Sequence, residues 1–432
     1  MRLHAGANWN NGTNSGSLSR NANNAGVNRN ANNAARGVIP WYLVFPNPKG
    51  QVARADSFTS RVSGNTNQGW QGASRNTERT EPEKRMKRHG NLWEQFISKE
   101  NFQIALNNAI RGKKNRDYVK KFMMDPENNL ERIRQDMIHK RFHTAKYTEK
   151  EIYEPKKRII YMLPFVPDRI VQHALMRILI PILEKLFITD TYASIDGRGM
   201  HKGSKRVMQF IANNDYFLKC DIRKFYPSVD HDILMDIVRH KIKDKNILWL
   251  IEDIVRSFPG DKNLPIGNYF SQWGGNLYLN ELDYYVKNKL KCKCYLRYCD
   301  DFCLFSNDKK QLAEWREKIR IFLAERLKLI YSKAEISHIK NGVDFLGYRH
   351  FRRNGKRYIL VRKRTARRMI KSIRKTKRGY NKGFIPVEQA LSRVGSYYGW
   401  VKYANSHHLK ISTRIDGFMR YLKNEQDSKK IQ

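Results

Sequence analysis

The stretch Cys294-Tyr-Leu-Arg-Tyr-Cys-Asp-Asp-Phe-Cys-Leu-Phe-Ser306 decides the fold. Two adjacent aspartates, Asp300 and Asp301, stand between two short runs rich in aromatic and aliphatic residues. Such runs are typical of strands, and the acid pair falls where a tight turn would join them. Successive strand side chains point to opposite faces, so only a turn aims Asp300, and with it Asp301, at one point. Mg²⁺ suits such a place, because it takes oxygen ligands from one or two carboxylates and from substrate phosphates.

An isolated Asp-Asp pair is more often a solvated turn, because Asp is common in turns. Here a second acid, Asp221, lies about eighty residues upstream in the apolar stretch Phe217-Leu-Lys-Cys-Asp-Ile222. A carboxylate at the end of a buried strand needs a cation or another polar partner. Two such strands side by side would bring Asp221 and Asp300 together, which is the arrangement that two-metal phosphoryl transfer requires.

In this order and spacing, the Asp221 strand and the Tyr298-Cys-Asp-Asp301 hairpin resemble the palm motifs of reverse transcriptases. The resemblance extends from about residue 91 to residue 405. It includes blocks typical of the bacterial branch related to group II introns: Pro167-Asp-Arg-Ile-Val-Gln-His-Ala174, Gly197-Arg-Gly-Met-His201, Ser332-Lys333 and Gly342-Val-Asp-Phe-Leu-Gly-Tyr348. The fold class it implies is α/β, a right-hand polymerase with fingers, palm and a helical thumb.

One block is more specific. Most of that branch carries Gln-Gly-x-x-x-Ser-Pro between the two acid motifs, whereas this chain has Ile266-Gly-Asn-Tyr-Phe-Ser-Gln272. The substitution resembles the signature of diversity-generating retroelement reverse transcriptases. That family implies error-prone copying at template adenines and a small, basic, helical accessory protein as partner. An amide at Gln272, where proline is usual, changes backbone freedom and hydrogen-bonding capacity, so a looser pocket edge is a plausible physical cause of low fidelity.

The resemblance also implies roles for individual residues. Two Mg²⁺ ions would be held by Asp221, Asp300 and Asp301, with Ile222 beside Asp221 as a further ligand. Tyr226 would stack beneath the sugar and exclude a 2′-hydroxyl, since a ribose oxygen would collide with the ring. Template or incoming deoxynucleoside triphosphate would be contacted by Arg158, Arg169, Arg198, Ile266, Gly267, Gln272 and Lys333. Solvated basic residues and an ordinary buried aromatic are the simpler interpretations of these positions.

The charge indicates a polyanionic partner. The chain has 432 residues, 83 Lys plus Arg against 41 Asp plus Glu, and a formal net charge of +42. Such a protein repels itself unless it meets a polyanion, and nucleic acid is the obvious candidate. No segment approaches the ~20 apolar residues of a membrane-spanning helix, and we see no secretory signal, so no membrane partner is expected.

Four of the five cysteines cluster within twelve residues, which raises the possibility of zinc. Their spacing, Cys292-x-Cys294-x4-Cys299-x3-Cys303, is not that of a usual zinc knuckle. Buried small side chains in a reduced, cytoplasmic protein are therefore the default interpretation.

The chain is predicted to divide into residues 1–84 as an Asn-rich extension and linker, 85–214 as fingers, 215–348 as palm and 349–432 as thumb. Residues 8–33 hold eleven asparagines and almost no aliphatic residues, a composition that favours disorder. This segment also resembles the Asn-rich end of retroelement variable proteins, so a translated remnant of the template repeat is a second hypothesis. Residues 168–187 and 364–377 are predicted helices, and residues 358–361 a strand.

The basic thumb is the predicted nucleic-acid contact. Residues 345–387 contain sixteen Lys or Arg and no acid, which fits tracking of phosphates better than a solvated face. The residues expected to grip RNA template and cDNA are Arg362, Lys363, Arg364, Arg367, Arg368 and Lys371.

Three other functional classes stay open. A group II intron maturase would carry Gln-Gly-x-x-x-Ser-Pro and often a Cys/His-rich tail, and neither is present. A non-catalytic RNA-binding protein derived from a polymerase would lack an acid at 221, 300 or 301, and all three are intact. A retron or defence reverse transcriptase shares the catalytic acids and is the nearest competitor.

Overall fold

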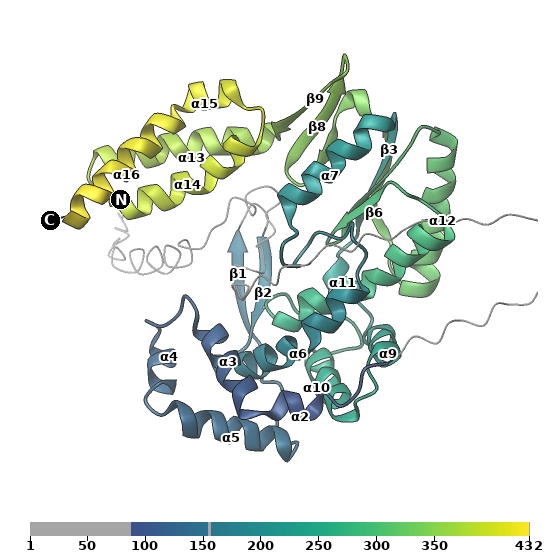
Figure 1. The fold of residues 1–432 in the computed structure, drawn as a ribbon, viewed down its shortest axis with the longest axis vertical. Helices are drawn as coiled ribbons and strands as arrows, with labels where there is room; N and C mark the ends of the chain where they lie inside the picture. Colours follow the sequence, from purple (N-terminus) through teal and green to yellow (C-terminus); the bar gives the residue numbers. More distant parts are fainter. Residues whose placement is uncertain (1–87, 154–156, 432) are drawn as a thin grey trace, which may run out of the picture.

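A computed structural model describes residues 88–153 and 157–431. In Figure 1 an N-terminal group of helices, a central sheet with helices around it, and a C-terminal group of helices follow one another along the chain. The mixed helices and antiparallel sheets confirm the predicted α/β class. The predicted Asn-rich extension, residues 1–84, lies outside the described residues.

The N-terminal helices pack around one long buried helix. They are α2 (Trp93–Ile97), α3 (Lys99–Ile110), α4 (Asp117–Phe122), α5 (Pro126–Ile138) and α6 (Ile170–Leu186). The Ser98 hydroxyl caps α3 by accepting a hydrogen bond from Asn101 N at 3.2 Å. The Asn101 amide then donates to the Ala174 carbonyl at 3.2 Å and so ties α3 to α6. The predicted helix over residues 168–187 is confirmed as α6, after a π-helical turn, η4 (Phe165–Arg169).

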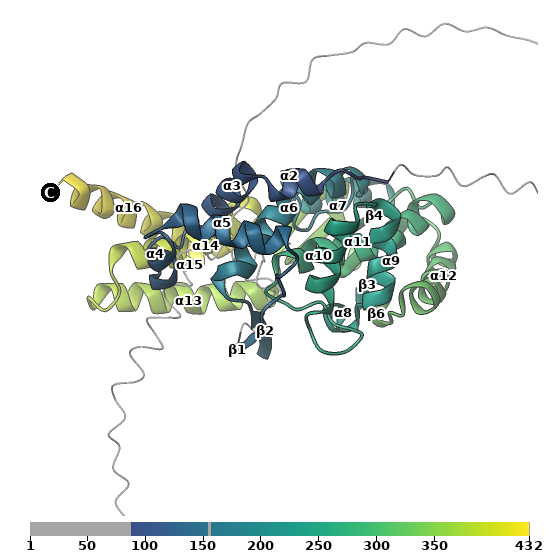
Figure 2. The ribbon, with the colours of Figure 1, turned by 90° about the horizontal axis from the view of Figure 1, so that it is seen from below.

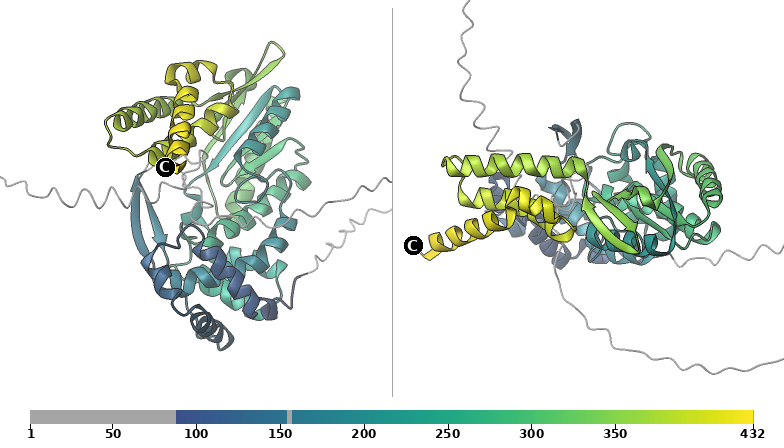
Figure 3. Two further views of the ribbon diagram at one scale, coloured as in Figure 1. Left: turned by 60° about the vertical axis from the view of Figure 1, so that its left-hand side comes forward. Right: turned by 90° about the horizontal axis from the view of Figure 1, so that it is seen from above.

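A two-stranded antiparallel sheet projects from these helices. Strands β1 (Thr148–Tyr153) and β2 (Lys157–Met162) pair from Thr148↔Met162 to Tyr153↔Lys157. Neither strand contains a buried residue, and the exposed positions of β2 are Lys157 and Ile159. In Figures 2 and 3 this hairpin stands out from the helices, and it points toward the C-terminal helices in Figure 3.

The central sheet has the strand order β4-β5-β3-β6 and is antiparallel throughout. Its strands are β3 (Tyr216–Ile222), β4 (Tyr295–Tyr298), β5 (Asp301–Ser306) and β6 (Tyr331–His338). The sequence therefore predicted β3 and the β4–β5 hairpin correctly.

Both faces of this sheet are buried, each in a different core. Leu218 and Cys220 of β3, with Phe302 and Leu304 of β5, belong to the core shared with the N-terminal helices. Phe217, Cys303 and Phe305 belong to a second core shared with the C-terminal part. The alternation follows the two-residue period of a strand.

Helices cover the sheet and lead into its strands. They are α7 (Met200–Asn213), α8 (Phe225–Ser228), α9 (His231–Lys241), α10 (Lys245–Arg256), α11 (Tyr269–Tyr284), the π-helical η5 (Tyr285–Lys289), α12 (Lys309–Leu327) and the 3₁₀ turn η6 (Ile339–Asn341). Helix α12 contacts β3, β5 and β6, whereas α7 contacts β4. Asp230 caps α9 by accepting from the backbone N–H groups of Asp232 and Ile233, both at 3.2 Å.

A three-stranded sheet connects the centre to the last helices. Its strands β7 (Val343–Phe345), β8 (Tyr348–Arg353) and β9 (Lys356–Val361) pair in that order. The turn Asn354-Gly355 has positive φ at both residues, 49° and 71°, as a two-residue type I′ hairpin requires. The helices that follow are α13 (Lys363–Asn381), α14 (Val387–Tyr403), α15 (His407–Thr413) and α16 (Ile415–Ile431). The predicted strand at 358–361 and helix at 364–377 are thus confirmed, each inside a longer element.

The predicted domain limits stay predictions. The limit after residue 348 falls at the first residue of β8, whose sheet continues to Val361. Among the described residues, no helix combines the length and the apolar character that crossing a membrane requires.

Candidate active site

Asp221 and Asp301 face each other across two antiparallel strands. The register pairs Asp221 of β3 directly with Asp301 of β5, and it pairs Asp221 with Lys333 of β6 on the other side. Directly opposite residues share a face of the sheet. The row Asp301–Asp221–Lys333 therefore crosses one face, and by strand alternation this is the face that carries Phe217, Cys303 and Phe305 further along.

Asp300 occupies the turn that joins β4 to β5. The preceding residue, Cys299, has a φ of 53°, so the chain reverses through the left-handed region just before the acid pair. Asp300 is half-buried, whereas Asp301 is only 2% exposed. The turn thus places Asp300 next to Asp301 in the chain, and it is Asp301 rather than the predicted Asp300 that lies directly opposite Asp221.

Two carboxylates directly opposite each other repel, and a cation between them would relieve that repulsion. The donor set consists of oxygens, which Mg²⁺ prefers. The Ser332 hydroxyl already donates to Asp221 Oδ2 at 2.5 Å. The Ile222 side chain is a hydrocarbon without a ligand atom, so the predicted ligand would be the main-chain carbonyl oxygen of Ile222. Among the described residues, no three His, Cys, Asp or Glu side chains form a group that could hold a metal, and the predicted pair of Mg²⁺ ions stays a prediction.

A buried ion pair lies next to the turn that carries Asp300. Both Arg297 and Asp283 have fully buried side chains, and Arg297 Nη2 lies 2.6 Å from Asp283 Oδ2. Arg297 Nη1 donates to the carbonyl of Cys299 at 3.1 Å, and this contact fixes the first residue of the turn. Although burial lowers the pKa of Arg297, the Asp283 carboxylate raises it above its usual value. The side chain is therefore a permanent cation that orients the turn.

Three more contacts complete this network. The Tyr295 hydroxyl donates to Asp283 Oδ1 at 2.6 Å, and the Thr191 hydroxyl donates to Asp283 Oδ2 at 2.9 Å. Arg297 Nη1 also donates to Asn276 Oδ1 at 3.1 Å. Strand β4, helix α11 and the loop before α7 are thereby joined at one buried point directly below Asp300.

Two of the predicted substrate contacts lie near Asp300. Burial lowers the pKa of Arg158 on β2, and the negative charge of Asp300 opposes that effect, so the β1–β2 hairpin approaches the turn between β4 and β5 here. Burial raises the pKa of Tyr226 well above its usual value, and the nearby Cys299 and Asp300 raise it further. The Tyr226 ring also packs close to Gly275 of α11.

The block Ile266–Gln272 connects the fingers hairpin to the start of α11. Tyr161 N of β2 donates to the Ile266 carbonyl at 2.8 Å. Gly267 has a φ of 129°, and a Cβ there would lie 2.1 Å from Tyr161 O, so only glycine fits. Gln272 is buried at 5% exposure on α11, and its Nε2 has no hydrogen-bond partner among the described residues.

Gln172 of α6 supports the block Ile266–Gln272 from another helix. The Gln172 side-chain carbonyl accepts hydrogen bonds from the Tyr269 and Phe270 backbone N–H groups at 2.9 and 3.3 Å. Gln172 Nε2 also donates to Asn268 Oδ1. Gln172 therefore caps α11 from another helix and holds the block in place.

Other predicted contacts lie elsewhere. Arg198 Nη1 donates to the carbonyls of Ile188 and Thr191 at 2.6 and 2.9 Å, so its guanidinium organises the loop before α7. Burial lowers the pKa of Lys113 and of His173, and the positive charge of Arg169 lowers both further. Lys333 forms an ion pair with Glu335 at 2.8 Å. Triphosphate or template contact by these residues stays a prediction.

The predicted nucleic-acid contacts lie on and next to α13. Thr365, Met369, Ile373 and Thr376 form its buried face. Lys363, Arg364, Arg367 and Lys371 are exposed on the other side, and Arg368 is half-buried. Arg362 forms an ion pair with Asp344. The helix thus turns a row of cations outward, as phosphate contact requires.

The sequence analysis missed the residues that position the site. Arg297 looked like part of an apolar strand, and Asp283 went unnoticed between Leu282 and Val286 of a helical stripe. An acid at a core position of a helix, with an arginine at a core position of the next strand, is the signal that could have paired them. Gln172 carried no such signal, because its partners lie about a hundred residues away.

Comparison with known proteins matches residues 148–350 to the family described as reverse transcriptase (RNA-dependent DNA polymerase). Protein YkfC of Escherichia coli (strain K12) is 25% identical over 264 residues, covering 50% of this chain and 69% of that protein. Group II intron-encoded protein LtrA of Lactococcus lactis subsp. cremoris is 24% identical over 278 residues, covering 47% of this chain and 46% of LtrA. Nuclear intron maturase 1, mitochondrial, of Arabidopsis thaliana is 29% identical over 93 residues, covering 22% of this chain and 13% of that protein.

Proposed function

We propose that the chain is an RNA-directed DNA polymerase that extends a primer on an RNA template with deoxynucleoside triphosphates and Mg²⁺. The match of residues 148–350 to the reverse transcriptase family supports this proposal. The observation that supports it best is the placement of Asp221 opposite Asp301, with Asp300 in the adjoining turn. Carboxylates that face each other from adjacent strands suit metal-assisted phosphoryl transfer. Asp221, Asp300 and Asp301 would hold the two ions, which would lower the pKa of an attacking 3′-hydroxyl and stabilise the leaving pyrophosphate.

The chain's own residues would orient the reactants. Arg158 approaches Asp300 from the fingers hairpin and offers a cation to a triphosphate. The half-buried Tyr226 ring, held against α11, would limit the space beside the sugar. The exposed cations of α13 would hold the backbone of the template–primer duplex.

Primer extension on an RNA template, with Mg²⁺ and purified protein, tests the proposal. Asp300→Ala should lower the rate about a thousand-fold, the equivalent of about 4 kcal/mol of transition-state stabilisation. Asp232→Ala is the matched control, because Asp232 is an exposed carboxylate of α9 paired with Arg256 on the surface. If the wild type makes no DNA and Asp300→Ala behaves identically, the chain is a nucleic-acid-binding protein without catalysis.

We further propose error-prone copying at template adenines in a diversity-generating retroelement, with a basic helical accessory protein as partner. The support is the block Ile266–Gln272 and the buried Gln272 amide, whose Nε2 has no partner among the described residues. Sequencing of cDNA made with and without a candidate accessory protein tests this. Errors should concentrate at template adenines, and Ile266→Gln with Gln272→Pro should spread or reduce them.

A group II intron-type reverse transcriptase is the competing assignment. The names of two relatives, an intron-encoded protein and an intron maturase, favour it. Errors spread evenly over the four template bases, together with faster splicing of an intron RNA when the protein is added, would support this assignment and remove the retroelement role.

A further inference from the structure

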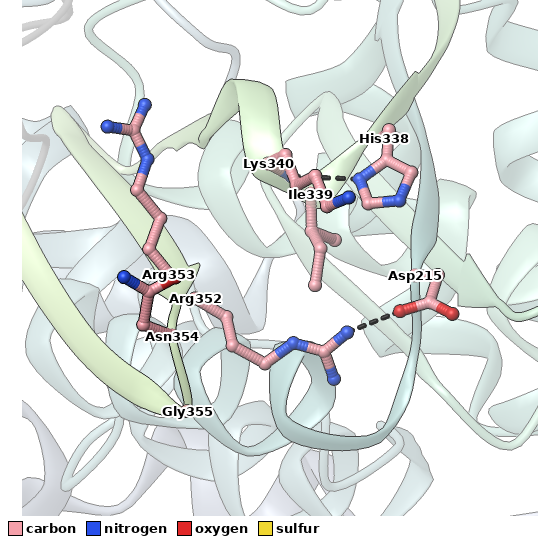
Figure 4. A pocket seen from close by; sticks show the side chains of 8 residues that line it. All are labelled: Asp215, His338, Ile339, Lys340, Arg352, Arg353, Asn354 and Gly355. Atoms are coloured by element: carbon pink, nitrogen blue, oxygen red, sulfur yellow. Dashed lines mark hydrogen bonds and ion pairs between the residues drawn. The ribbon is translucent and has the colours of Figure 1, made fainter.

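A groove lies between the β8–β9 hairpin and the end of β6. Its volume is about 520 Å³. Figure 4 shows Lys340 and Arg353 on its rim, with Arg352 reaching across to Asp215. His338 completes the polar lining. The groove is therefore bordered by side chains that can carry positive charge.

Positive charge is in excess in this region. The hairpin, residues 348–361, contains five Lys or Arg and no acid, namely Arg349, Arg352, Arg353, Lys356 and Arg357. The one carboxylate that lines the groove, Asp215, is already paired with Arg352. Lys340, Arg353 and Lys356 are exposed and form no ion pair within the part of the chain that the structure describes. These three side chains therefore form a positively charged surface that a partner could contact.

Two arginines of the hairpin, Arg352 and Arg353, are positioned by contacts. Arg352 Nη1 donates to the Ala212 carbonyl at 2.5 Å, which fixes the hairpin to the end of α7. The Arg353 guanidinium lies 5.2 Å from the centre of the Phe351 ring, which in turn stacks on Tyr358 at 5.1 Å. The tight Asn354-Gly355 turn restricts the tip further. Less conformational entropy is therefore lost when an anion binds here.

The groove lies far from the predicted catalytic carboxylates. Asp215 immediately precedes β3, whereas Asp221 lies near the other end of that strand. Six residues of extended chain span about 20 Å. Figure 1 shows the β8–β9 hairpin pointing away from the β1–β2 hairpin. Contact with substrate at the Asp221 end of the sheet does not account for these cations.

We propose that this groove binds the phosphodiester backbone of a nucleic acid at a second site, separate from the predicted catalytic centre and from α13. Guanidinium and ammonium groups that border a groove are suited to successive phosphates, to which Arg binds bidentately and Lys as a point charge. Its ligand is a part of a folded RNA that lies outside the copied region. The site would keep the protein on one RNA while the template moves through the catalytic centre, so this role rests on the proposed polymerase function.

The test compares two variants of equal charge. The groove variant is Lys340→Gln/Arg353→Gln/Lys356→Gln. Lys340 and Arg353 line the groove, Lys356 pairs with Arg353 across the hairpin, and the structural Arg352 stays in place. The matched control is Lys309→Gln/Lys310→Gln/Lys318→Gln, three exposed lysines of α12. Affinity for a long folded RNA and for a DNA duplex is measured over a series of NaCl concentrations. Thermal melting and extension of a short primer–template are measured in parallel.

The groove variant should reduce the salt slope of RNA binding by about two to three, since each lost phosphate contact removes about one. At physiological salt its RNA affinity should fall roughly tenfold or more, with melting unchanged and a smaller loss of short-template extension. Equal loss of RNA and duplex DNA affinity would assign recognition to the backbone alone, whereas loss for RNA alone would assign it to RNA shape. The α12 variant should change the slope by less than about one.

Two results would overturn the proposal. An equal effect of the groove and α12 variants would mean that only total charge matters. Unchanged RNA affinity, with lost binding of poly-aspartate, would assign the groove to an acidic protein instead. Failure of the polymerase assignment would show as a lack of primer extension by the wild type. RNA binding is measured without catalysis, and Asp300→Ala should retain full RNA affinity.

Discussion

At the scale of single residues, Gly267 is the position with the least freedom. Its φ of 129°, and the 2.1 Å that would separate a Cβ at this position from Tyr161 O, leave no room for any side chain. Gly267→Ala should therefore lower the free energy of unfolding by about 1–3 kcal/mol more than Gly260→Ala does. Gly260 is the matched control, because its φ is 92° and a Cβ there meets nothing within 4 Å. Equal losses in urea unfolding would show that β2 moves aside without cost.

The Arg297–Asp283 pair is the other residue-scale prediction. Arg297→Met and Asp283→Leu each leave a buried charge without its partner, and each should cost about 3–5 kcal/mol. The double variant leaves neither charge, so it should cost clearly less than the sum of the two. Urea denaturation of all four proteins measures this coupling. A coupling near zero would mean that Tyr295, Thr191 and Asn276 satisfy each partner alone.

At the scale of elements, one buried histidine joins α7 to the β7–β8 sheet. His350 Nδ1 donates to the Val343 carbonyl at 3.0 Å, so its neutral Nε2 accepts from the Ser204 hydroxyl at 2.7 Å. Burial lowers the pKa of His350 from 6.5 to about 4, although the Val343 carbonyl opposes that shift. Folding thus favours the neutral ring, and protons bind more readily to the unfolded chain over this range.

The stability that His350 contributes should be complete above about pH 6.5 and should be lost as the pH falls toward 4. The loss should approach about 1.4 kcal/mol per pH unit within that window. His350→Gln cannot titrate, so the difference in unfolding free energy between wild type and variant should shrink on acidification. Burial lowers the pKa of His173 to about 3. His173 titrates in both proteins, so its contribution to the difference in unfolding free energy cancels. A pH-independent difference would contradict the argument.

Local pattern decided which elements the sequence could predict. Strand β3 and the β4–β5 hairpin could be predicted from the sequence, because each is a short apolar run with acids only near its end. Strand β8 was missed, although Asn354-Gly355 is a strong hairpin signal. The position of Arg198 among carbonyls and the capping of α11 by Gln172 depend on tertiary contacts, which no local pattern encodes. The sequence therefore predicted that the acids lie together, and it missed the residues that hold them there.

At the scale of the whole molecule, the net charge of +42 predicts two opposite salt effects. Salt screens self-repulsion in the protein alone, so its free energy of unfolding should rise between about 0.05 and 0.3 M NaCl. Affinity for nucleic acid should fall over the same range, because the release of counterions on binding is less favourable in more concentrated salt. Sucrose at matched osmolality is the control for effects without ions. Stability that falls with NaCl would show that local ion pairs, rather than repulsion, dominate.

The position of β3 between β5 and β6 also determines when β3 can pair during synthesis of the chain. Both neighbours of β3 come later in the chain, and about eighty residues separate Asp221 from Asp301. At roughly 5–20 residues per second, a ribosome needs about 4–16 seconds to supply the first partner. During that interval the nascent strand has two open edges and is a natural target for chaperones. Nascent chains arrested before Asp301 should be cut by protease within β3, whereas chains released after His338 should resist.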